Sequence, residues 1–87
     1  MDVFEQLALM EKLRDEIQEV DIELLSFLEK RVKIAKKIGD IKRENNKPFY
    51  VPEVEKKKIE KLASTCEFPG LVETLWPMIM CYTRSVE

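Results

Sequence analysis

Two basic residues stand in the N-terminal half of the sequence where a helical pattern calls for apolar ones. Apolar side chains recur there every three or four residues, and the same rhythm after Leu28 gives Arg31 and, later, Lys42. Arg31 and Lys42 are eleven residues apart, about three helical turns, so they project from one face. Buried cations are costly unless an anionic group meets them, and this spacing therefore suits the binding of an anion.

Three more polar side chains fall on the inward faces of later helical segments. Glu55 leads one apolar stripe, while Thr83 and Glu87, four residues apart, share another. Each has a simpler explanation: a charge at a helix start, a hydroxyl at the core edge and a frayed terminus. The two cations could likewise snorkel, or pair with glutamates across a dimer. Together the five residues predict a polar pocket in a helical core, and such pockets commonly bind ligands.

Arg14 precedes Arg31 by seventeen residues, which is about 25 Å along a helix. It therefore cannot reach the same pocket within one chain. If two long helices pair antiparallel, the Arg14 end of one approaches the middle of the other. The pocket could then receive Arg14 from a partner chain.

The sequence contains no histidine, which is the commonest general base and metal ligand. Hydrolysis by a histidine-containing triad and metal-assisted chemistry are therefore not expected. An enzyme of this composition would need little proton transfer, and we expect neither a metal nor a cofactor.

Residues 3–44 contain no proline and a single glycine, Gly39, before Asn45-Asn46-Lys47-Pro48 stops the pattern. A helix of that extent would be about 60 Å long. A compact chain of 87 residues has a radius of gyration of only about 12 Å. The rest of the chain cannot cover such a stripe, so we expect an intertwined helical homodimer with a very long first helix.

Two shorter helices are predicted after this segment, so that residues 1–87 form one all-α domain of three helices. The second begins near Pro52, and Phe68-Pro69-Gly70 separates it from a third that runs from about Leu71 to the end. Pro77 leaves two possibilities for the third helix. It either kinks at Pro77, or starts late with Thr74 as its cap.

The charge pattern argues against nucleic acid as a partner. Fifteen basic and seventeen acidic side chains are well mixed, with a formal net charge of −2 and no basic patch. No segment approaches the roughly 18 apolar residues of a membrane span, and the start shows no signal peptide. Two cysteines are too few for a disulfide framework, and we expect a cytoplasmic protein.

The N-terminal half resembles the long first helix of the AroQ-class chorismate mutases. The loop that ends in Asn46-Lys47-Pro48-Phe49-Tyr50 is similar to that family's connection to its second helix. The similarity of the helix rests on Leu13-Arg14-Asp15-Glu16-Ile17, Val20-Asp21, Glu23-Leu24-Leu25, Leu28, Lys30-Arg31, Ile34-Ala35 and Ile38-Gly39-Asp40-Ile41-Lys42. The resemblance implies an isomerase of the shikimate pathway, which converts chorismate to prephenate in aromatic amino acid biosynthesis.

The resemblance also implies roles for the residues singled out above. Arg14 from the partner chain and Arg31 would bind the two carboxylates of chorismate. Lys42 would reach the ether oxygen and a carboxylate, and Glu55 would accept from the ring hydroxyl. Thr83 and Glu87 correspond by spacing to a serine and a glutamine of the family. As a carboxyl group, Glu87 can donate to the ether oxygen only when it is protonated, which implies a preference for acidic pH.

The sequence departs from the family at the start of the second helix. The usual Asp-Pro-x-Arg-Glu reads Val51-Pro52-Glu53-Val54-Glu55 here, so an acidic residue and an arginine are missing. This leaves other readings open: a regulatory module that binds chorismate or prephenate without converting it, and an enzyme similar to the isochorismate pyruvate lyases. A third is a purely structural helical dimer in which Arg31 and Lys42 pair with acidic residues.

Overall fold

A computed structural model describes all residues, 1–87, as three helices without a strand. Helix α1 spans Val3–Glu44, α2 spans Pro52–Thr65 and α3 spans Pro69–Val86. The prediction of an all-α chain with three helices is therefore confirmed. None of these helices combines the length and apolar character needed to cross a membrane. The chain divides into two compact units, Met1–Arg31 and Val32–Glu87.

The first unit is a single helical segment, the N-terminal part of α1. Asp2 caps it, because its Oδ1 accepts from the backbone N–H of Glu5 at 2.8 Å. No residue of this unit is buried, and large apolar side chains such as Ile17 and Val20 are 61% and 60% exposed. The apolar stripe predicted from the sequence is thus present on this segment, and no other residue of the unit packs over it.

The turn after α1 ends the helix with hydrogen bonds to the carbonyl groups of its last turn. Asn46 adopts a positive φ of 53°, a left-handed conformation that asparagine tolerates better than most residues. This allows the Lys47 N–H to donate back to the carbonyl of Lys42 at 2.8 Å. The Asn45 amide donates to the carbonyl of Ile41 at 2.9 Å. The turn therefore fixes the last residues of α1, including Lys42.

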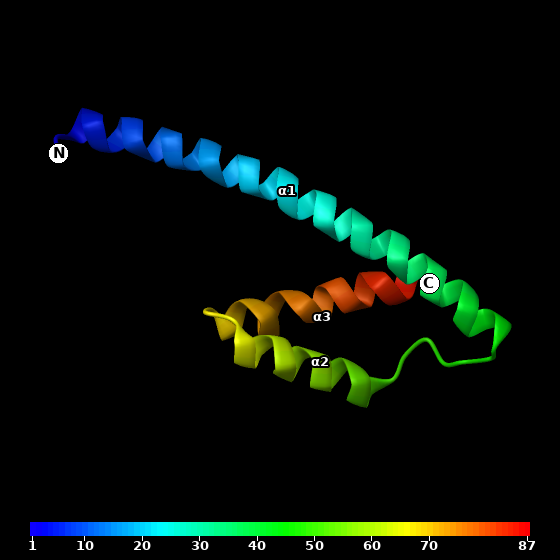
Figure 1. Cartoon of the computed structure of the whole chain (residues 1–87). Helices are drawn as coiled ribbons and strands as arrows, with labels where there is room; N and C mark the ends of the chain where they lie inside the picture. The colour runs from blue at the N-terminus through cyan, green and yellow to red at the C-terminus, as the bar shows by residue number, and fades with distance from the viewer. The chain divides into compact units, whose positions relative to one another are not determined.

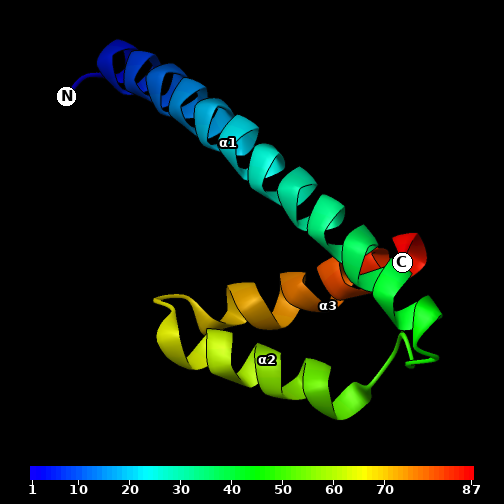
Figure 2. The same cartoon turned by 45° about the vertical axis from the view of Figure 1, so that its right-hand side comes forward.

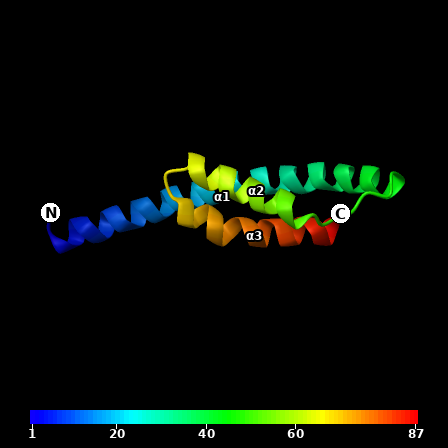
Figure 3. The same cartoon turned by 90° about the horizontal axis from the view of Figure 1, so that it is seen from below.

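Helices α2 and α3 pack against each other in the second unit (Figures 1 and 2). Each begins with a proline in its first turn, where the missing N–H costs no hydrogen bond. The two helices run antiparallel, so the start of α2 lies beside the end of α3, and the connecting loop lies at the other end (Figure 3). Val72 and Met80 of α3 and Ala35 of α1 form the buried core of this unit.

Pro77 lies inside α3, which begins at Pro69. The alternative in which the helix starts late, with Thr74 as its cap, is therefore wrong. A proline at this position has no N–H to donate to the carbonyl of Glu73, four residues earlier. Glu73 is exposed to solvent, where water can satisfy its carbonyl.

Candidate functional site

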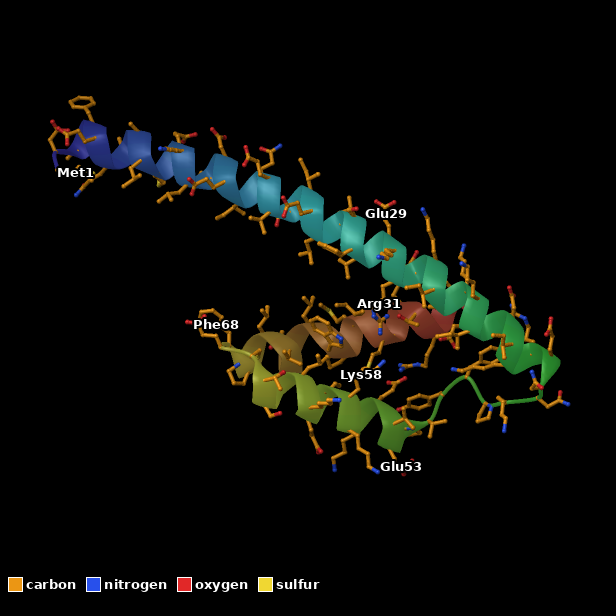
Figure 4. All side chains as sticks on the ribbon, in the orientation of Figure 1. Met1, Glu29, Arg31, Glu53, Lys58 and Phe68 are labelled. Carbon is orange, nitrogen blue, oxygen red and sulfur yellow. The ribbon has the colours of Figure 1, made fainter.

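The six residues predicted for the site are divided between the two units. Arg14 and Arg31 belong to the first unit, and the other four belong to the second. Arg14 is exposed and forms an ion pair with Glu11 at 3.2 Å, a contact between neighbouring turns of one helix. Arg31 is half-buried (labelled in Figure 4).

Lys42 and Glu87 lie in contact at the meeting point of α1 and the end of α3. The Nζ of Lys42 is 3.1 Å from Oε2 of Glu87, although the two residues are 45 positions apart in sequence. The side chains are 26% and 6% exposed, so the pair is shielded from water more than a surface ion pair. The structure thus brings together two of the predicted site residues.

The ammonium group of Lys42 has a second partner in the loop before α2. Its Nζ lies 3.4 Å from the backbone carbonyl oxygen of Phe49 and 5.9 Å from the centre of the Phe49 ring. The guanidinium of Arg43 is also 5.9 Å from that ring. Phe49 was not among the predicted site residues, although its ring contacts two neighbouring cations.

The backbone of Glu87 is held by α1 as well as by its own helix. Arg43 donates to its carbonyl oxygen, and its N–H donates to the carbonyl of Thr83 at 3.1 Å. The Thr83 hydroxyl donates to the carbonyl of Ile79 at 2.8 Å, within α3. Thr83 therefore lies one helical turn before Glu87, as its spacing predicts.

Glu55 is paired with a residue that the sequence analysis did not single out. Nη1 of Arg84 lies 2.5 Å and 2.6 Å from its two carboxylate oxygens. The guanidinium of Arg84 also stacks 4.4 Å from the centre of the Tyr50 ring. The hydrogen bond to Glu55 raises the pKa of Arg84, while desolvation acts in the opposite direction.

Val51 and Val54, where the sequence differs from the family pattern, place no polar side chain near Glu55. Val51 precedes α2 without a side-chain cap, and Val54 is 60% exposed. Arg84 brings a positive charge to Glu55 from the other helix. An antiparallel α2–α3 pair could have suggested this, because it places the last turn of α3 beside the first turn of α2.

The second unit therefore holds two ion-paired groups of side chains. Lys42 and Arg43 are paired with Glu87 and Asp40, and Arg84 is paired with Glu55. No group of three or more Asp, Glu, Cys or His side chains lies close enough to hold a metal ion. Lysine and arginine donors of this kind suit the binding of an anionic molecule that also offers a hydroxyl or ether oxygen.

Comparison with known proteins agrees with this chemistry. A bifunctional chorismate mutase/prephenate dehydratase of Aquifex aeolicus (strain VF5) is 45% identical over 53 residues, which are 61% of this chain and 15% of that protein. A T-protein of Enterobacter agglomerans is 32% identical over 78 residues, 85% of this chain and 21% of that protein. The chain thus spans well under a third of the length of either relative. No solved structure matches it. The family model of chorismate mutase type II matches residues 13–87, and the chain therefore belongs to that family.

Proposed function

We propose that this chain converts chorismate to prephenate. The observation that carries the proposal is the contact of Lys42 with Glu87 at 3.1 Å, in a chain whose residues 13–87 match the chorismate mutase type II family. The two similar proteins are several times longer than this chain. The proposal therefore concerns the reaction catalysed by this domain.

The reaction is a unimolecular pericyclic rearrangement, which needs no general base, metal or covalent intermediate. The catalyst must hold a dianion in its folded, reactive shape and place positive charge beside the oxygen of the breaking bond. Arginines and a lysine provide both functions, and the absence of histidine from the sequence is no disadvantage for such chemistry.

Lys42 is the residue that we assign to the ether oxygen and a substrate carboxylate. An ammonium group has three N–H donors, and in the free chain one points to Glu87 and one to the Phe49 carbonyl. One donor is left for a ligand. Glu87, when protonated, supplies a second donor next to the first, so that the two residues act on the same oxygen.

Glu55 is assigned to the ring hydroxyl of the substrate, with Arg84 as its partner. Arg84 occupies both carboxylate oxygens of Glu55 through one nitrogen. Each carboxylate oxygen has two lone pairs, so Glu55 can still accept from a hydroxyl. Arg84 in this way supplies a positive charge at the start of α2, where Val54 offers none. Thr83 would donate to a substrate carboxylate from the last turns of α3, once its single O–H leaves the carbonyl of Ile79.

Arg14 and Arg31 complete the proposed site as a clamp on the two carboxylates, with Arg14 supplied by a second copy of the chain. Support comes from the first unit, which has an apolar stripe but no buried residue. A helical segment without tertiary contacts is marginally stable in water, and a second copy would bury its stripe. We accordingly propose a homodimer with two equivalent sites. Sedimentation at a series of concentrations tests it, and a monomer throughout would refute it.

The proposed activity is tested by spectrophotometric measurement of prephenate formation from chorismate between pH 5 and 8. We expect turnover that requires neither a metal nor a cofactor and persists in the presence of a chelator. A protein that is folded and dimeric, yet produces prephenate no faster than the uncatalysed reaction across this range, would refute the proposal.

One observation favours a second function, a module that binds chorismate or prephenate without converting it. Val51 and Val54 stand where the family usually has an acidic residue and an arginine. Calorimetry distinguishes the two functions, since the module would bind chorismate that stays unchanged. Pyruvate release from isochorismate would instead indicate a lyase. Absence of binding would favour a structural dimer in which the Lys42–Glu87 pair only stabilises the fold.

A further inference from the structure

Gly39 of α1 lies against the backbone of Glu87 at the end of α3. A Cβ atom built on Gly39 would lie 2.8 Å from the carbonyl oxygen of Glu87, 2.9 Å from its Cα and 3.0 Å from its Cβ. Real Cβ atoms almost never show contacts below 3.0 Å, and two of these three atoms are backbone. Nothing lies within 4 Å of the corresponding position at Gly70, the other glycine of the chain.

The conformation of α1 does not itself require a glycine at this position. No glycine of the chain has a positive φ, so Gly39 has ordinary helical geometry. In the interior of a helix, glycine is less favourable than alanine by about 0.5–1 kcal/mol. The local structure would therefore be more stable with alanine, and the contact with Glu87 is the feature that only glycine permits.

Three residues of α1 act on Glu87 from one side of the helix. Gly39 lies one turn before Lys42 and Arg43, which places the three on neighbouring positions of the helix surface. Gly39 contacts the Glu87 backbone, Arg43 donates to its carbonyl oxygen, and Lys42 donates to its carboxylate. The close backbone approach thus sets how far the Glu87 side chain reaches along α1.

We propose that Gly39 is a positioning residue of the active site, which acts by allowing the Glu87 carboxyl group to lie on Lys42. The role in catalysis rests on the proposed function, whereas the effect on the Lys42–Glu87 pair exists in the free chain. A methyl group at residue 39 displaces the backbone of Glu87 and, with it, the donor that acts beside Lys42 on the ether oxygen.

The kinetic test compares Gly39→Ala with the matched control Gly70→Ala. Gly39→Ala is expected to lower kcat by roughly 10- to 100-fold, since small misplacements of a reacting group have effects of this size. Gly70→Ala should leave kcat unchanged. In the Glu87→Ala background, Gly39→Ala should cost nothing further, because it acts through the missing side chain. Additive effects of the two substitutions, or full activity of Gly39→Ala, would overturn the proposal.

A measurement without substrate separates this proposal from the proposed function. In the free protein, the ¹⁵N resonance of Lys42 Nζ should move in Gly39→Ala to the position that it has in Glu87→Ala. In Gly70→Ala it should stay at the wild-type position. If Gly39→Ala keeps the wild-type resonance, Gly39 does not position Glu87. If the wild-type protein has no mutase activity, the proposed function is refuted. The resonance of Lys42 would still show whether Gly39 positions Glu87.

Folding of the variant is checked by circular dichroism. If Gly39→Ala loses helical content, deletion of Glu87 from that variant removes the three atoms nearest to the new methyl group. Recovery of the helical content would support the proposed contact as the cause. A variant that stays unfolded after this deletion would show that Gly39 is required for another reason, which would overturn the proposal.

Discussion

Arg84 donates from a single nitrogen to both carboxylate oxygens of Glu55, at 2.5 Å and 2.6 Å, and so joins the last turn of α3 to the first turn of α2. Its guanidinium is also stacked on the ring of Tyr50. Both partners lie on or next to the start of α2. Glu55 is therefore oriented by a residue from another helix before any ligand binds.

Replacing Arg84 by alanine should weaken the binding of chorismate. Without its partner, Glu55 can rotate away from the ring hydroxyl, and losing a charge-assisted hydrogen bond costs about tenfold or more in affinity. We expect KM to rise by roughly this factor and kcat to fall less. Arg84→Lys keeps the positive charge but loses the planar guanidinium, so its KM should lie between those of the wild type and Arg84→Ala. Equal KM values for wild type and Arg84→Ala would contradict this role.

The effect of Arg84 on stability should not depend on pH in the neutral range. Its folded pKa is raised by Glu55, and a raised pKa gives stabilisation that is complete below the unfolded value and lost only as pH rises through the folded one. That loss therefore belongs to strongly alkaline solution. Thermal melts of wild type and Arg84→Ala should differ by the same amount at about pH 6 and pH 9. A difference that shrinks over this interval would argue against the ion pair.

Lys42→Ala and Arg31→Ala should each largely abolish turnover. Removal of one donor that acts on charge developing in a transition state typically costs about 100- to 1000-fold in kcat. Both variants should remain dimeric by sedimentation, because the apolar side chains of the stripe are unchanged. The neighbouring exposed residue Lys36 provides a control, and Lys36→Ala should keep its activity. Activity above a tenth of wild type in Lys42→Ala would exclude Lys42 from the site.

Mixing two inactive variants tests whether the sites are shared between chains. Arg14→Ala and Arg31→Ala homodimers should both be inactive. A mixed dimer has one site with both arginines and one with neither, so random exchange should restore about a quarter of wild-type activity. The mixture must first be unfolded and refolded together to allow exchange. No gain over the unmixed variants would show that Arg14 does not act in trans.

Glu87→Gln should flatten the pH profile of kcat. A glutamine amide donates a hydrogen bond at every pH, whereas the carboxyl group of Glu87 donates only when protonated. The rate of the variant should therefore depend less on pH than the rate of the wild type. An unchanged profile would place Glu87 outside the reaction.

Helix positions and inward faces could be predicted from the sequence because they depend on local patterns. The prolines at residues 52 and 69 begin α2 and α3, and the asparagines after Glu44 form the turn that ends α1. Thr83 and Glu87 share a face because their spacing matches one helical turn. These features require no knowledge of how distant segments pack.

The family resemblance implied that Lys42 and Glu87 act on one ether oxygen, but residue spacing alone could not predict which side chains of different helices pair. Such pairs depend on the packing of α3 against its neighbours. Nothing in the spacing of Lys42 and Glu87 indicates that they meet across 45 positions of sequence. The pairing of Arg84 with Glu55 likewise requires the antiparallel arrangement of α2 and α3. The sequence likewise does not reveal that Gly39 lies against the backbone of Glu87.

Pro77 divides the hydrogen-bond ladder of α3 into two stretches. Unwinding that starts at Pro69 meets this gap after two turns, before it reaches the turn in which the Glu87 N–H donates to the Thr83 carbonyl. Local opening of the first stretch therefore need not spread to the second. Amide hydrogen exchange should accordingly be faster before Pro77 than after it. The half of α3 nearest the loop can then unfold locally while the half that contains Thr83 and Arg84 stays helical.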